Sequence, residues 1–182
     1  MKNWYFFKFK GSFINENFKP THNATGKYHC IKTSAKQSVS PHGIKFLSKI
    51  NFQPYDEFNF FQGPPQKLSD IHIDNLNESY AINYIYAAKK SKLVWYDLID
   101  KSAIGLKTKT FPAQSNYITF RQDQVRQIDE LAIPVNTLMI IRTDIPHQVI
   151  NESNQMRYCL SLRGFPKLDW VNIVDYFSNH LI

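Results

Sequence analysis

Short segments of β-type sequence, each ended by turn residues, constrain the fold of this chain more than any other feature. Residues 80–86 are rich in β-branched and aromatic side chains, and after a turn at Lys89-Lys90-Ser91 residues 93–96 return as the second strand of a predicted hairpin. Further strands are expected at residues 115–121, 124–130, 138–142, 147–151 and 156–163. The intervals are too short for the helical crossovers of a parallel sheet. The pattern therefore predicts a mainly β protein, either a sandwich or a jelly-roll barrel.

Two flanking segments are expected to be helical. Ser40 and Pro41 are typical of a helix N-cap and a first helical position, and residues 39–51 carry apolar side chains near helical spacing. Residues 169–182 also place apolar side chains on one helical face. At 182 residues the chain has the length of one domain that buries a core. We therefore expect a single β domain with a few flanking helices.

Composition argues against several classes of protein. An apolar fraction of 43% disfavours disorder, and no apolar run reaches the length of a membrane span. Lys8 and Lys10 interrupt the amino terminus too early for a signal peptide, so we expect a cytoplasmic protein without a membrane partner. Cys30 and Cys159 form no CxxC unit and predict neither a disulfide framework nor a zinc ribbon. The net charge of +7 is spread along the chain, which is compatible with nucleic acid without indicating it, and the oligomeric state stays open.

Three residues of metal-ligand type occur in an order that is compatible with one metal site. His72-Ile73-Asp74 lies where the chain enters its β-rich part, and side chains two residues apart on a strand point to the same side. His147 begins a later predicted strand and could complete a face of two imidazoles and one carboxylate. Such a face leaves half of an octahedral metal open, as non-haem Fe(II) oxygenases require. Each element alone is more often an ordinary surface or strand-edge feature, so the order and spacing carry the prediction.

The last predicted strand has a polar face and an apolar face. Arg157, Cys159, Ser161 and Arg163 alternate with Tyr158, Leu160 and Leu162. The polar face either meets solvent or lines the mouth of a ligand cavity, where an Arg would match a carboxylate by bidentate hydrogen bonding. We expect residues 147–151 and 156–163 to pair as a hairpin, which would make His147 and Arg157 neighbours.

This arrangement resembles the Fe(II)/2-oxoglutarate-dependent oxygenase superfamily, whose core is a double-stranded β-helix, a jelly-roll and cupin-like barrel. The resemblance is carried by His72-Ile73-Asp74, by His147 and by Arg157. The run Pro146-His147-Gln148-Val149, followed by Arg157, is similar to phytanoyl-CoA-hydroxylase-like and aspartyl/asparaginyl-hydroxylase-like members. The metal and co-substrate core would span residues 69–163, with an N-terminal elaboration at 1–68 and a C-terminal helix at 169–182.

The resemblance implies a dioxygenase. Fe(II) would be held by His72, Asp74 and His147, and 2-oxoglutarate would be bound through Arg157. With O2 these would hydroxylate a prime substrate that the sequence does not identify, with release of succinate and CO2.

One position departs from the pattern of the superfamily. Many relatives have Ser two residues after the co-substrate Arg, where this chain has Cys159. Ser161, or a tyrosine from residues 80–86, would then supply the second contact to 2-oxoglutarate. Arg142 and Arg163 are second candidates for binding the anion.

Two other functions stay open. A cupin-like metal protein, acting for example as an isomerase or epimerase, would not use 2-oxoglutarate and would not need a buried Arg157. A non-enzymatic jelly-roll module for binding or structure would leave His72 and Asp74 as surface residues.

Overall fold

The computed structural model describes residues 2–19, 26–74, 79–87, 89–110 and 116–182, and in this part the chain is mainly β with few helices. The strands are β1 (Trp4–Phe6), β2 (His29–Thr33), β3 (Gln53–Pro54), β4 (Phe58–Gly63), β5 (Lys67–Leu68), β6 (Ile71–Ile73), β7 (Tyr80–Tyr86), β8 (Ser91–Leu98), β9 (Leu106–Lys109), β10 (Asn116–Phe120), β11 (Val125–Ile133), β12 (Thr137–Arg142), β13 (His147–Asn151), β14 (Arg157–Leu162) and β15 (Gly164–Phe165). The helices are α1 (Ala35–Ser38), α2 (Pro41–Lys49) and α3 (Trp170–Phe177), with 3-10 turns η1 (Gln122–Gln124) and η2 (Ser178–His180).

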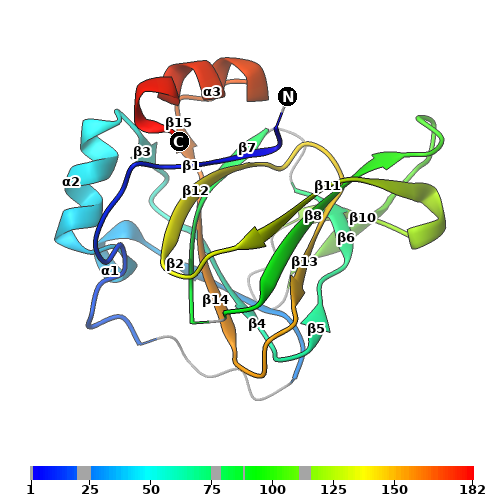
Figure 1. Cartoon of the computed structure of the whole chain (residues 1–182), viewed down its shortest axis with the longest axis horizontal. Coiled ribbons are helices and arrows are strands. Elements are labelled where there is room, and N and C mark those ends of the chain that lie inside the picture. Colours follow the sequence, from blue (N-terminus) through cyan, green and yellow to red (C-terminus); the bar gives the residue numbers. More distant parts are fainter. Residues whose placement is uncertain (1, 20–25, 75–78, 88, 111–115) are drawn as a thin grey trace.

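Most of the strands form two antiparallel sheets that face each other (Figure 1). The first sheet has the order β1-β12-β7-β14-β4-β2, and the second has the order β11-β8-β13-β6-β10-β9 with β5 beside β13. A small third sheet pairs β15 with β3. Residues 1–68, which the sequence suggests as an elaboration, supply β1, β2 and β4 of the first sheet.

The predicted hairpins are wrong in their pairing, although their strands exist. β7 lies in the first sheet and β8 in the second, so the two strands do not pair with each other. β13 and β14 are divided in the same way, since β13 pairs with β8 and β14 pairs with β7 and β4. His147 and Arg157 are therefore not neighbours on paired strands but lie on opposite sheets. The physical reason is that these strands bury both faces, and they gain more contacts by closing two layers than by pairing locally.

Helices cover the outer face of the first sheet. α2 begins at the predicted place, with Ser40 as N-cap accepting a hydrogen bond from the backbone N–H of Gly43 (3.0 Å). Its Leu47 and the Ile173 and Phe177 of α3 are buried against Ile140 and Leu160 of the sheet. In Figure 1 α2 and α3 lie at the left and at the top, outside β12 and β14. The C-terminal helix is shorter than predicted, because α3 ends at Phe177 and continues only as the η2 turn.

Between the sheets lies a second apolar cluster. Its members come from both layers: Ala81, Ile85, Leu93, Trp95, Leu131, Ile133, Met139, Ile141 and Cys159. The remaining predicted strands agree with observed ones to within three residues at each end, and Ser115, the first residue of one of them, lies outside the described residues. The alternation of β14 is confirmed, since Leu160 and Leu162 pack under the helices while Cys159 packs between the sheets.

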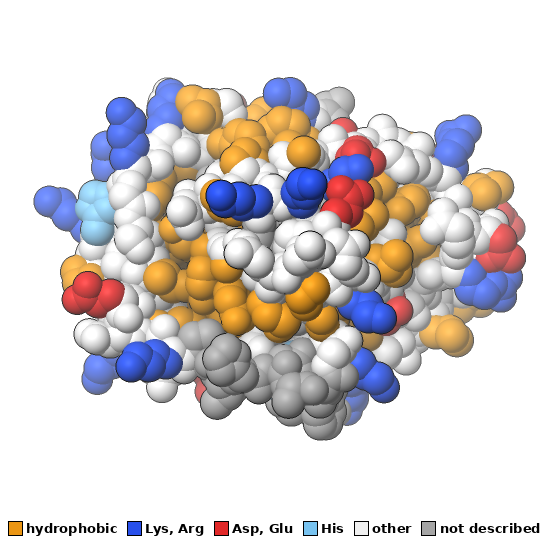
Figure 2. Space-filling model, turned by 60° about the horizontal axis from the view of Figure 1, so that its bottom comes forward, with side chains coloured by type: hydrophobic (Ala, Val, Ile, Leu, Met, Phe, Trp, Pro, Cys, Tyr) orange, Lys and Arg blue, Asp and Glu red, His pale blue; other side chains and the backbone are white. Residues whose placement is uncertain are grey.

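The surface carries scattered charge. In the face shown in Figure 2, Lys and Arg side chains lie apart from one another around the outline and centre, with apolar side chains between them. Lys92 is held by two carboxylates, those of Glu130 (3.3 Å) and Glu152 (3.1 Å). Among the described residues, no helix is both long enough and apolar enough to cross a membrane.

Truncation of Leu160 tests the packing of helices on the first sheet. Leu160 is 0% exposed, and Leu160→Ala should lower the free energy of unfolding by about 2–5 kcal/mol because it leaves a cavity under the helices. The matched control is Leu106→Ala at an edge position that is 73% exposed, which should change stability by less than about 0.5 kcal/mol. Urea unfolding followed by circular dichroism measures both, and equal losses would contradict the assigned layers.

Candidate metal centre

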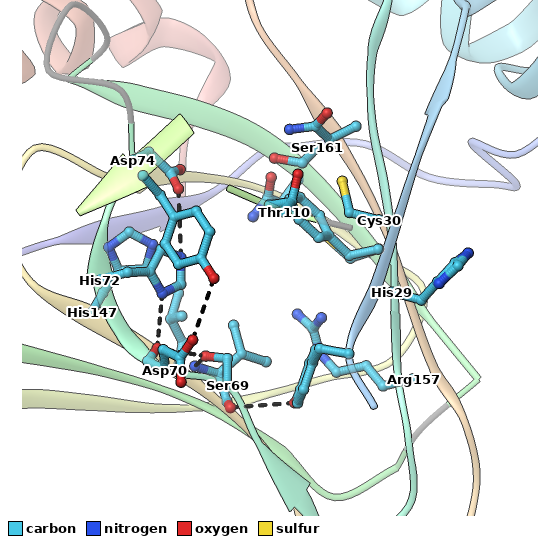
Figure 3. Close-up of a pocket in the computed structure, with 18 of the residues that line it drawn as sticks. His29, Cys30, Ser69, Asp70, His72, Asp74, Thr110, His147, Arg157 and Ser161 are labelled. Atoms are coloured by element: carbon cyan, nitrogen blue, oxygen red, sulfur yellow. Dashed lines mark hydrogen bonds and ion pairs between the residues drawn. The ribbon is translucent and has the colours of Figure 1, made fainter. Parts of the chain in front are cut away.

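A cavity of about 770 Å³ lies between the two sheets. Side chains of both layers line it, and those of most chemical interest are drawn in Figure 3. His72, Asp74 and His147 lie together on one side, and Arg157 points into the cavity from the opposite side. The polar face of β14 therefore lines a cavity, which decides between the two interpretations of its alternation.

Three potential metal ligands converge on the second sheet. His72 is the middle residue of β6, and Asp74 follows directly after that strand, so both side chains lie on its inner face. His147 begins β13 and is the direct register partner of His72. One ligand atom from each of the three residues lies within 4.8 Å of the other two. The juxtaposition predicted from the sequence is therefore present.

Both imidazoles are held in the tautomer that metal binding requires. The Nδ1 of His72 lies 2.8 Å from the carbonyl oxygen of Asp70, and the Nδ1 of His147 lies 3.0 Å from that of Ile145. A carbonyl only accepts, so each Nδ1 carries the proton and donates it. In the neutral form of each ring, Nε2 then carries the lone pair, and the backbone bond fixes the orientation of the ring. The two rings stack at an angle, with centroids 4.4 Å apart.

Asp74 is paired with a cation that the sequence did not single out as its partner. The Nη2 of Arg163 contacts one carboxylate oxygen of Asp74, and the Nε2 of His72 lies 3.5 Å from the other. Burial alone would raise the pKa of Asp74, but the charge of Arg163 and the hydrogen bond from His72 outweigh it and hold that pKa well below its usual range. The carboxylate is therefore ionised near neutral pH.

The two histidines are shifted in opposite directions. Burial lowers the pKa of His147 to about 4, and the neighbouring His72 adds to this effect. For His72 burial also lowers the pKa, but the hydrogen bond and charge of Asp74 outweigh burial and raise it overall. His147 is neutral at pH 7, which is the state that binds a metal.

Arg157 is a buried cation without a carboxylate partner. Its side chain is 3% exposed, and its Nε has no hydrogen-bond partner. None of the ion pairs in the described part of the chain includes it. Burial raises the pKa of the adjacent Cys159 thiol, and the charge and hydrogen bond of Arg157 reduce that rise without cancelling it. The thiol is protonated near neutral pH, so it does not neutralise Arg157.

The other residues proposed for anion binding lie in different surroundings. Ser161 faces the cavity and lies four residues along β14 from Arg157. Its Oγ accepts a hydrogen bond from Nη1 of Arg163 (3.0 Å). Arg142 bonds Asp144 (2.6 Å), and it is not among the residues that line the cavity. Of the three tyrosines in residues 80–86, Tyr80 and Tyr84 belong to the cluster under the helices, and Tyr86 packs against it. The predicted second contact therefore does not lie beside Arg157.

Tyr28 is a residue beside Arg157 that sequence reasoning missed. It lines the cavity, and its hydroxyl donates to the carbonyl oxygens of Lys67 and Val149 (3.3 Å each). Burial raises its pKa, while the charge of Arg157 acts in the opposite direction. Gly63, the register partner of Arg157, leaves room for the ring, since a Cβ there would lie 2.8 Å from it. No sequence pattern signals this contact, because Tyr28 precedes β2 and reaches the site only through tertiary packing.

The opposite shifts of the two histidines can be measured in the metal-free protein. In an NMR titration, His147 should stay neutral until the pH falls to about 4, whereas His72 should become protonated at a pH above its ordinary midpoint. Asp74→Asn should lower the pKa of His72, because it removes the charge that stabilises the imidazolium. Coincident titration of the two rings in wild-type protein would contradict the geometry.

Comparisons with known proteins do not place the chain in a family. No family model and no curated protein matches the sequence. Among solved structures, ycfD of E. coli is similar with 12% identity over 75% of this chain and a TM-score of 0.41, and the match covers only 33% of that protein. Peruvianin-I, a cysteine peptidase from Thevetia peruviana latex, has 12% identity over 92% of this chain and 93% of its own, with a TM-score of 0.36. Neither likeness is strong enough to assign a fold family or a function.

Proposed function

We propose that this protein is a dioxygenase that depends on Fe(II) and 2-oxoglutarate and hydroxylates a small prime substrate. The observation that carries the proposal is the placement of His72, Asp74 and His147 on one wall of an internal cavity, with the unpaired cation Arg157 on the opposite wall. Two imidazoles and one carboxylate form the donor set typical of non-haem Fe(II) oxygenases.

The order of the strands supports a double-stranded β-helix as the fold. Eight strands, β4, β6, β7, β8, β11, β12, β13 and β14, form two antiparallel four-stranded arrays within the sheets. Numbered along the chain from one to eight, the arrays have the orders 6-3-8-1 and 5-4-7-2, so the chain winds between the layers. This order supports the proposal of a jelly-roll barrel, a fold in which ligand sites lie between the layers.

The residues fit the metal by their chemistry. With each Nδ1 committed to a backbone carbonyl, Nε2 of His147 and, once its proton is lost to the entering metal, Nε2 of His72 would offer a lone pair, and Asp74 is ionised. When bound there with 2-oxoglutarate and O2, Fe(II) would supply the oxidation of a C–H bond with release of succinate and CO2. The protein's part is to hold the three ligands and, through the two sheets, to keep bulk water from the cavity.

Arg157 would bind the distal carboxylate of 2-oxoglutarate. A planar guanidinium matches a carboxylate with two parallel hydrogen bonds, and burial strengthens that pairing. Tyr28 lines the same end of the cavity, and its hydroxyl would give the second contact by turning from the carbonyl oxygens of Lys67 and Val149 to donate to the carboxylate. Ser161 accepts a hydrogen bond from Arg163 and lies four residues from Arg157 along β14, so Tyr28 replaces it as the proposed second contact.

One observation favours a second candidate, a binding module without a metal. Arg163 forms an ion pair with Asp74, so a side chain of the protein itself neutralises the carboxylate. The two functions differ in a melting assay, because a ligand that binds only the folded state raises the melting temperature. Stabilisation by Mn(II) followed by further stabilisation by 2-oxoglutarate is expected for the dioxygenase, and absence of both shifts is expected for the module.

Removal of a metal ligand should abolish both metal binding and turnover. His72→Ala is expected to eliminate Fe(II)-dependent succinate formation and the stabilisation by Mn(II), because one of three donors is lost. His180→Ala is the control, since His180 lies outside the cavity and should leave both measurements unchanged. Normal succinate formation by the His72→Ala protein would show that the assigned ligands are wrong.

Removal of Arg157 should act on the co-substrate rather than on the metal. Arg157→Ala is expected to raise the 2-oxoglutarate concentration needed for half-maximal succinate formation by about 100-fold, the cost of losing a buried charged contact. Stabilisation by Mn(II) alone should change little. The exposed Arg126→Ala serves as control for the loss of a positive charge. An unchanged requirement for 2-oxoglutarate would transfer the role to another cation.

A further inference from the structure

We infer that a row of four polar residues across the first sheet binds the prime substrate, and that this substrate is a small anionic molecule with an N–H or O–H donor. The polar row consists of Lys32, Asn59, Ser161 and Asn83, all of which line the cavity. The inference rests on the proposed function, because that function makes the bound molecule the substrate that is hydroxylated. The binding site itself consists of residues that neither hold the metal nor contact Arg157.

The polar row follows from the register of four neighbouring strands. Lys32 of β2 is opposite Asn59 of β4, Asn59 is opposite Ser161 of β14, and Ser161 is opposite Asn83 of β7. With neighbouring strands about 4.8 Å apart, the row spans about 14 Å of backbone. Lys32 stands on the edge strand at the mouth, and Asn83 lies deep in the cavity.

An apolar row separates these residues from the co-substrate end. One step along the same face, Cys30, Phe61, Cys159 and Ile85 are in register across the same four strands. Arg157 lies a further step beyond, opposite Gly63. Figure 3 shows Ser161 and Arg157 at different ends of the cavity. The two polar regions are therefore distinct, and a molecule bound at Arg157 would leave the polar row free.

The buried side-chain oxygen of Asn83 has no hydrogen-bond donor. The side chain of Asn83 is 7% exposed. Its neighbour Ser161 is engaged with Arg163, and Arg163 in turn holds Asp74 of the metal centre. An unsatisfied buried amide oxygen costs free energy, which a substrate N–H or O–H would recover. The donor would then lie near the metal centre.

Lys32 supplies the positive charge at the mouth of the cavity. It is exposed, and none of the ion pairs among the described residues includes it. Glu57 is the opposing charge, since it lines the cavity two residues before Asn59 on the same face. Its diagonal position puts it about 7–8 Å from Lys32 rather than in contact. Lys32 is thus available for a carboxylate or phosphate, with Glu57 weakening the attraction.

The test uses a matched set of probes on protein loaded with Mn(II) and N-oxalylglycine, an unreactive analogue of 2-oxoglutarate. The probes are 6-acetamidohexanoate, its neutral amide 6-acetamidohexanamide, and 5-acetamidopentyl phosphate. Each has an amide N–H for Asn83 and a chain that extends toward Lys32. NMR titration should give a dissociation constant about threefold lower for the carboxylate than for the neutral amide, as a partly exposed charge contact allows. The dissociation constant of the phosphate, compared with that of the carboxylate, shows which anion is preferred.

Three variants and one control locate the contacts. Lys32→Gln should abolish the preference for the anion, and Glu57→Gln should increase it, because the two charges act in opposite directions. Asn83→Leu should weaken the acid and the neutral amide alike, by about fivefold, since both lose the same hydrogen bond. Lys45→Gln removes an exposed positive charge on α2, outside the cavity, and should change none of these values.

The outcomes separate the inference from the proposed function. Equal binding of acid and amide by wild-type protein, or a preference that survives Lys32→Gln, would overturn the inference while the metal and N-oxalylglycine remain bound. Failure of Mn(II) and N-oxalylglycine to bind would contradict the proposed function instead. The comparison of wild type with Lys32→Gln in unloaded protein would then still decide on the polar row, because Arg157 is common to both.

Discussion

The ion pair of Asp74 with Arg163, buried between the two sheets, organises the cavity of this protein. Asp74 and Arg163 lie where water has little access, and each would be costly to bury alone. Their ion pair, with His72 bonded to the same carboxylate, makes that end of the cavity nearly neutral. The pair also fixes the carboxylate beside the two imidazoles, so the arrangement needed for metal binding is prepared by the folded chain itself.

At the opposite end of the cavity, no carboxylate of the described residues balances the positive charge of Arg157. Arg157 is as well buried as the residues of the core. The neighbouring Cys159 is a neutral thiol and cannot compensate the charge. A buried guanidinium of this kind is stable only if a ligand or solvent supplies the missing acceptors. The distribution of charge therefore favours an anionic ligand at Arg157 over one at Arg163, which is already neutralised.

The sequence predicts the individual strands and the face that each residue occupies, but not which strands pair. Period-two alternation places Arg157 and Ser161 on one face of β14, and this depends only on the backbone. The assignment of β13 and β14 to opposite sheets depends on pairing with β8 and β7, which are distant in sequence. The contact of Tyr28 with the Arg157 end could not be predicted for the same reason.

The same alternation explains how one strand can serve two ligands. Along the inner face of β14, Arg157 and Ser161 are separated by Cys159, which packs in the apolar cluster between the sheets. The apolar row separates the hydrogen-bonding groups of the polar row from Arg157 by one step along the strands. A co-substrate held at Arg157 and a substrate held on the polar row would then approach the same metal centre from different directions. Their binding energies would be set by separate residues, so a change at Lys32 could alter substrate preference without weakening the co-substrate site.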